Sequence, residues 1–160
     1  MGILFEPIRQ FLPNEKEIVF SLFKSIFDSS EVPYFDATWK GRSPSSVGLF
    51  SRRGELRGFA LVVGNEIKYI GIAKRYQGRG YGSDLLHEVV QRTLHGVVRS
   101  VWLIPVDDPT VMNWYIKRGF ALSSTRILSS NDRQHRMVYR DYNTRSCSQK
   151  YMRKARPIFS

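Results

Sequence analysis

The chain has 160 residues, of which 42% are hydrophobic and 13% aromatic, and its formal net charge is +11 at pH 7. This length fits one domain with a single core, and the composition excludes a disordered chain. No apolar run approaches the roughly 20 residues of a membrane-spanning helix, and the single cysteine, Cys147, excludes a disulfide framework and a cysteine-rich zinc module.

In chain order, residues 3–9 are predicted to form a strand. An amphipathic helix is predicted over residues 14–29, because a capping-box pattern is followed by apolar residues at helical spacing. Residues 30–45 contain two prolines and a glycine and are predicted as a long loop. Three aromatic residues of this loop either line a substrate entrance or fold under the sheet: Tyr34, Phe35 and Trp39.

The middle of the chain alternates in the manner of strands separated by glycine-containing turns, which predicts an antiparallel meander. The elements predicted from there on are strands at 47–51, 56–63 and 66–73, a helix at 82–95, a strand at 100–105, a helix at 109–118, and strands at 120–128 and 134–142. This order predicts a single-domain α/β fold, in which helices flank a mixed and mostly antiparallel sheet.

The domain is predicted to span residues 1–141, and residues 142–160 form a basic tail with five Lys or Arg and no acid. The tail carries +5 and the domain the remaining +6, so both attract phosphates of a cofactor or a nucleic acid. The start of the chain lacks the pattern of a secretory signal, and the lone cysteine suits a reducing compartment. We therefore expect an intracellular protein, cytoplasmic or nuclear, without a membrane partner.

The most informative segment is glycine-rich and lies between a strand and a helix. It contains Gly78, Gly80 and Gly82, three glycines in five residues, and also Arg79. Glycine lets another group approach bare backbone, and the N-terminus of the following helix attracts anions. The segment therefore predicts a pyrophosphate cradle. Its spacing differs from that of a dinucleotide-binding loop, and it lacks the lysine of a nucleoside-triphosphate P-loop.

The segment Gln77-Gly78-Arg79-Gly80-Tyr81-Gly82, with the strand before it, resembles the acetyl-CoA signature of the GNAT N-acetyltransferases. The run from Glu66 to Gly82 is similar without gaps to the histone lysine acetyltransferases of that superfamily. Further on, Trp114-Tyr115-Ile116-Lys117-Arg118-Gly119-Phe120 resembles the family's aromatic-x-x-x-Gly-Phe motif. The resemblance covers about residues 47–128.

The resemblance implies acetyl-CoA as the cofactor and a V-shaped splay between strands 66–73 and 100–105. Backbone groups of the first of these strands then bind the pantetheine arm. Pro105 favours the separation, because proline cannot donate to a strand ladder. The residues expected to bind the cofactor are Ile70, Gly71, Ile72, Gln77, Gly78, Arg79, Gly80, Tyr81, Gly82 and Ser83.

Acetyl transfer to an amine requires a neutral amine, a stabilised oxyanion and a proton for the departing thiolate. Tyr115 is the predicted acid, because a phenol has a pKa near that of the thiol; the alternative is a packed aromatic residue. Glu66 is the predicted base, acting directly or through a water, and the alternative is a solvated turn residue. A backbone N–H near Ile70 is expected to meet the oxyanion. The histidines show no metal-ligand spacing, and no metal site is predicted.

The sequence therefore predicts an acetyl-CoA-dependent N-acetyltransferase that acts by direct attack in a ternary complex. The expected acceptor is a primary amine, first of all a lysine of a protein or peptide. Glu31, Asp36, Asp107 and Asp108 are candidates for an acidic groove that would attract it. The alternatives are a small amine or polyamine, an aminoacyl-tRNA, or a non-enzymatic nucleic-acid-binding module that uses the basic surface and the tail. The oligomeric state is left open.

Overall fold

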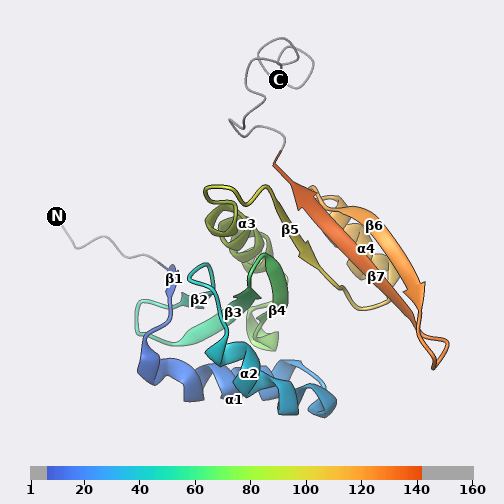
Figure 1. The fold of residues 1–160 in the computed structure, drawn as a ribbon. Helices are drawn as coiled ribbons and strands as arrows, with labels where there is room; N and C mark the ends of the chain where they lie inside the picture. Colours follow the sequence, from blue (N-terminus) through green and yellow to red (C-terminus); the bar gives the residue numbers. More distant parts are fainter. Residues whose placement is uncertain (1–6, 142–160) are drawn as a thin grey trace, which may run out of the picture.

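The computed structural model describes residues 7–141 (Figure 1). The N-terminal part contains β1 (Ile8–Gln10), the 3-10 helix η1 (Pro13–Glu15), α1 (Lys16–Ile26), the 3-10 helix η2 (Ser29–Tyr34) and α2 (Phe35–Lys40). The meander β2 (Val47–Phe50), β3 (Leu56–Val63) and β4 (Glu66–Ile72) follows, and then η3 (Lys74–Tyr76) and α3 (Tyr81–Thr93). The chain continues through β5 (Ser100–Leu103), α4 (Pro109–Ile116), β6 (Ala121–Ile127) and β7 (Arg133–Arg140).

The seven strands form one sheet in the order β1-β2-β3-β4-β5-β7-β6. All neighbouring pairs are antiparallel except β4 and β5, which run parallel. This arrangement confirms the predicted single-domain α/β fold with a mixed, mostly antiparallel sheet.

Alternation along β3 divides the core into two layers. Ala60 and Val62 face a cluster that includes the buried side chains of α3 and residues of α4. Phe59 and Leu61 face the other way, into an aromatic cluster with α1 and α2. Successive strand residues point to opposite faces, so α1 and α2 cover one face of the sheet and α3 and α4 the other (Figure 1).

The segment predicted as a loop over residues 30–45 is partly helical. It contains most of η2 and all of α2. Phe35 and Trp39 are buried in the aromatic cluster, whereas Tyr34 is 62% exposed. Of the two predicted roles, folding under the sheet is therefore correct for Phe35 and Trp39. Burial of these rings stabilises a helix too short to form alone.

Residues 1–6 and 142–160 lie outside the described residues. The start of the first predicted strand, the basic tail and Cys147 all fall there, and the division of the chain at residue 141 stays a prediction. Within residues 7–141, no helix combines the length and hydropathy needed to cross a membrane. The same part of the chain holds no group of three or more His, Cys, Asp or Glu residues that could bind a metal ion.

Candidate active site

The sheet opens between β4 and β5. The two strands pair only at Glu66 with Trp102 and at Ile67 with Leu103. β5 then ends, Pro105 follows, and β5 stays paired with β7 on its other side. The edge of β4 from Lys68 to Ile72 therefore lacks a strand partner on the β5 side, and Figure 1 shows β5 turning away from it. This V-shaped opening lies where the sequence predicted it.

A β-bulge lies at the narrow end of the V. Leu61 of β3 pairs with Tyr69 and Val62 pairs with Ile67, so Lys68 is an extra residue on β4. A bulge redirects the backbone and the side chains beyond it. Here it turns Ile67 and Tyr69, two residues apart, toward opposite layers of the core. Glu66 thus comes to the same side of the sheet as Tyr69.

The glycine-rich loop closes the wide end of the V. Gly78 and Gly80 have positive φ angles of 76° and 85°, and a Cβ built on either would meet no atom within 4 Å. Gly80 is the N-cap of α3 and provides no capping side chain. The first N–H groups of α3 therefore point out of the helix unpaired. These N–H groups lie where the sequence predicted an anion cradle, which stays a prediction.

Neighbouring side chains hold this loop in place. The side-chain amide of Gln77 donates to the carbonyl of Ile72 at 3.0 Å, so Gln77 ties the loop to the end of β4. Arg118 donates to the hydroxyl of Ser83 at 2.9 Å and lies 3.8 Å from the Trp114 ring. A Cβ on Gly82 would lie 3.5 Å from Trp114. The helix α4 thus packs against the first turn of α3 and forms the second wall of the opening.

Tyr115 lies on α4 in the cluster that borders the V. Its ring contacts Trp114 at 5.0 Å and Phe120 at 5.6 Å between centroids. Burial raises the pKa of Tyr115 to about 12. Its hydroxyl has no hydrogen-bond partner within residues 7–141. The side chain is therefore a protonated phenol whose donor is not used by the fold.

Glu66 lies at the narrow end, beside a second tyrosine. Its side chain is 17% exposed and pairs with Lys68 at 3.5 Å. Tyr69, which is buried, has a pKa raised to about 12, first by burial and then by the nearby carboxylates of Glu31 and Glu66. The carboxylates of Glu31 and Glu66 therefore both act on one phenol, that of Tyr69, which faces the α1 side of the sheet.

Tyr69 was missed by sequence reasoning, because strict alternation places it away from Glu66. The bulge at Lys68 reverses that alternation. A β-bulge at Lys68 cannot be recognised from a single sequence. The only available signal was Glu31, which the predicted acidic groove already contained.

The other acids of that predicted groove have partners of their own. Asp36 pairs with Lys16 at 2.9 Å, and Asp108 caps α4 by accepting from the N–H of Thr110 at 2.8 Å. Asp107 accepts from His135 at 2.7 Å, and this bond is the main reason why the pKa of Asp107 is lowered. Of the four acids, Glu31 is the one that acts on Tyr69, as Glu66 does.

Comparison with known proteins supports this geometry. A family model described as "Acetyltransferase (GNAT) family" matches residues 14–120. A search of curated proteins finds no significant match.

Solved structures share the fold at low sequence identity. Ard1 from Thermoplasma volcanium is 19% identical, with a TM-score of 0.66 over 83% of this chain and 95% of that one. The ribosomal-protein-S18-alanine N-acetyltransferase from Escherichia coli is 18% identical, with a TM-score of 0.65 over 86% and 97%. Arabidopsis thaliana Naa50, in complex with the bisubstrate analogue CoA-Ac-MVNAL, is 15% identical, with a TM-score of 0.64 over 84% and 97%.

Proposed function

The chain belongs to the GNAT family of acetyltransferases, which use acetyl-CoA as the donor, and we propose that its acceptor is a primary amine of a protein or peptide, in the first place a lysine. The observation that carries this proposal is the acidic surroundings of Tyr69 near the narrow end of the V. The carboxylates of Glu31 and Glu66 both act on the Tyr69 phenol and would attract a cationic amine. The family membership sets aside the non-enzymatic alternative.

The residues around the V fit acetyl-CoA. The unpartnered edge of β4 offers backbone groups of Ile70, Gly71 and Ile72 to a pantetheine arm, much as a neighbouring strand would. The open space beside Gly78 and Gly80 accepts a pyrophosphate, which the outward N–H groups of residues 80–83 and Arg79 would hold. When bound, acetyl-CoA supplies an acyl group activated as a thioester.

The chain's own groups then carry out three tasks. Glu66 removes a proton from the acceptor ammonium, directly or through a water, because a lysine with a pKa of about 10.4 is protonated at neutral pH. A backbone N–H of the β4 segment that follows the bulge donates to the carbonyl oxygen. The Tyr115 hydroxyl donates its proton to the departing sulfur. We propose direct attack of the amine, with both substrates bound together.

Two of the structural neighbours are associated with protein or peptide amines. The Escherichia coli enzyme is named for an alanine of ribosomal protein S18, and the Naa50 analogue carries the peptide MVNAL. These names support a protein or peptide acceptor. They also make a terminal α-amine the natural competitor of the lysine that the resemblance of Glu66–Gly82 favours.

Two matched peptides test the proposal. One carries a single lysine and a blocked N-terminus, and the other carries a free N-terminus with arginine in place of the lysine. CoA release and the mass of the product are followed with each peptide, and spermidine and aminoacyl-tRNA are offered separately. We expect acetylation of the lysine peptide. Transfer only to the α-amine would replace lysine by a terminal amine, and transfer only to spermidine or tRNA would refute a peptide acceptor.

A further inference from the structure

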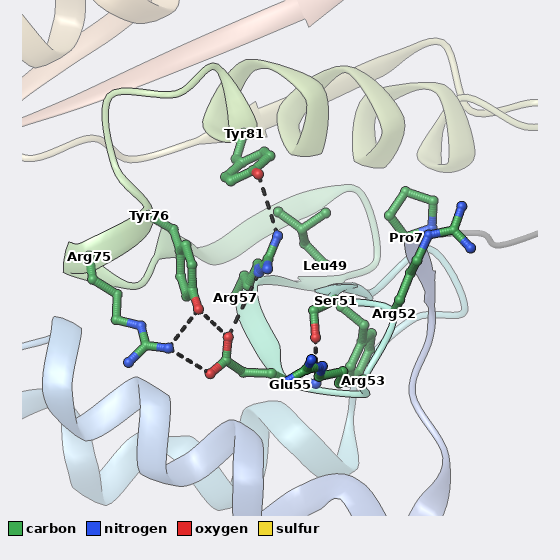
Figure 2. A pocket seen from close by; sticks show the side chains of 11 residues that line it. Pro7, Leu49, Ser51, Arg52, Arg53, Glu55, Arg57, Arg75, Tyr76 and Tyr81 are labelled. Carbon is green, nitrogen blue, oxygen red and sulfur yellow. Dashed lines mark hydrogen bonds and ion pairs between the residues drawn. The ribbon is translucent and has the colours of Figure 1, made fainter.

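A cavity of about 730 Å³ lies beside the β2–β3 part of the sheet. Its walls come from the turn between β2 and β3, the start of β3, η3 and the first residue of α3 (Figure 2). It adjoins the glycine-rich loop through Tyr81, and none of its lining residues comes from β4, β5 or α4, the elements that border the V.

The cavity is strongly basic. Arg52, Arg53, Arg57 and Arg75 line it, and Glu55 is the only acid among its lining residues. Arg75 donates to Glu55 at 2.9 Å, and the Tyr76 hydroxyl also donates to this carboxylate. The bond from Tyr76 is the main reason why the pKa of Glu55 is lowered. Among the lining residues, four arginines thus stand against one carboxylate, which already accepts two hydrogen bonds.

Arg57 stands in the middle of this cavity with a buried donor that nothing satisfies. Its Nε lies 3.8 Å from the Glu55 carboxylate, which is an ion-pair distance but too long for a hydrogen bond. That nitrogen is buried and has no hydrogen-bond partner within residues 7–141. An unsatisfied buried donor is costly, and elsewhere on the guanidinium Nη1 makes only a long bond, to the Tyr81 hydroxyl at 3.4 Å. The guanidinium is held against the Tyr76 ring, 4.6 Å from its centroid, and its direction is therefore set before a ligand arrives.

The opposite wall is held by a rigid turn. The Ser51 N–H donates to the carbonyl of Glu55 at 2.8 Å, and the Ser51 hydroxyl accepts from the Glu55 N–H at 3.0 Å. This turn presents Arg52 and Arg53 to the cavity (Figure 2). Apolar surface lies between the arginines, contributed by Pro7, Leu49 and Phe50. The cavity therefore combines cations for a phosphate with one exposed apolar residue, Pro7, whereas Leu49 and Phe50 are only 5% and 3% exposed.

We propose that this cavity binds a nucleoside phosphate at a site separate from the one that holds acetyl-CoA. Guanidinium groups are well suited to phosphate oxygens, because they donate in a planar fork. The volume is within the range of small-molecule sites. The sequence predicted a basic surface but not this cavity, because residues 52–57 and Arg75 meet only through the pairing of β3 with β4.

Calorimetry with ADP as the probe tests the proposal. The protein is first saturated with CoA, so that the V is filled, and is then titrated at about 150 mM salt. We expect one ADP per chain, and adenosine should bind about tenfold more weakly or worse, because it lacks the phosphates. Arg57→Gln and the double variant Arg52→Gln/Arg53→Gln should each lower the affinity for ADP by about tenfold or more. CoA affinity should change less than about twofold in both.

Arg126→Gln is the matched control, because Arg126 bonds to Gln134 at 2.8 Å on the β6–β7 hairpin, away from the cavity. It should leave ADP binding unchanged. The double variant on the exposed turn keeps the test valid if Arg57→Gln fails to fold. Absence of ADP binding, or binding that the arginine variants leave intact, would overturn the proposal. So would displacement of ADP by CoA, since the cavity would then hold the nucleotide end of the donor. An arginine-dependent affinity for a single-stranded oligonucleotide without affinity for ADP would replace it by nucleic-acid binding.

Discussion

Replacing Tyr115 by phenylalanine removes one oxygen atom and little else. The hydroxyl makes no hydrogen bond within residues 7–141, and the ring contacts with Trp114 and Phe120 are kept. The free energy of unfolding should therefore change by less than about 0.5 kcal/mol. If the hydroxyl protonates the leaving sulfur, kcat should fall about a hundredfold, the lower end of what a general acid contributes, which corresponds to about 2.7 kcal/mol.

The assay is CoA release at saturating acetyl-CoA and acceptor, from pH 6 to 9. Burial raises the pKa of Tyr115 to about 12, so the phenol keeps its proton across this whole range and the loss in kcat should be the same at each pH. The KM for acetyl-CoA should stay within about twofold. Tyr139→Phe is the control, because Tyr139 packs on Phe120 at 5.6 Å and has no proposed role. A Tyr115→Phe variant with more than half of the original kcat would reduce Tyr115 to a packing residue.

Three other changes probe the loop, the base and the fold. Gly80→Asp should weaken acetyl-CoA binding at least about a hundredfold in a titration, because it places a carboxylate where an anion is expected to bind. The control Gly96→Asp, at a similarly open site with φ of 61°, should bind acetyl-CoA normally. Glu66→Gln should lower kcat most at low pH, where the acceptor is most protonated, and a loss that is equal at all pH values would indicate positioning instead. Glu15→Gln should cost about 1 kcal/mol at neutral pH, because the carboxylate accepts two bonds from Arg9 at 2.9 and 2.8 Å. These bonds are the main cause of the lowered Glu15 pKa. Their contribution to the free energy of unfolding is therefore present above pH 4.5 and is lost as pH falls. A stability difference between wild type and variant that persists at pH 3 in acid denaturation would contradict this.

The strands were predictable where alternation and glycine turns agreed. Residues 56–63 match β3 at both ends, because the apolar run stops at the turn around Gly64. The helix of residues 35–40 was not predictable in the same way. Pro33 and Gly41 favour a loop locally, and the burial of Phe35 and Trp39 against distant strands overrides that preference.

The candidate active site also has a part that local sequence predicts and a part that depends on distant residues. The glycine-rich loop and the start of the helix after it were predictable, because they are adjacent in sequence. The group around Tyr69 was not, since it depends on the bulge at Lys68 and on Glu31, which lies some 40 residues away. His135, on β7, is buried and bonds to both Asp107 and Thr125. Such partners meet only through strand pairing.

The short ladder between β4 and β5 affects the resistance of the protein to local unfolding. Two residue pairs and the bonds of Asn65 to Ser100 and Trp102 join the two halves of the sheet there, and Arg118, just beyond α4, bonds to Ser83 of α3. We expect this seam to open before the rest of the molecule in amide exchange. Acetyl-CoA bound in the V would contact both halves of the sheet. At a concentration of one hundred times its Kd, it would raise the free energy of unfolding by about 2.7 kcal/mol. The supply of acetyl-CoA would then govern the abundance of the protein as well as its rate.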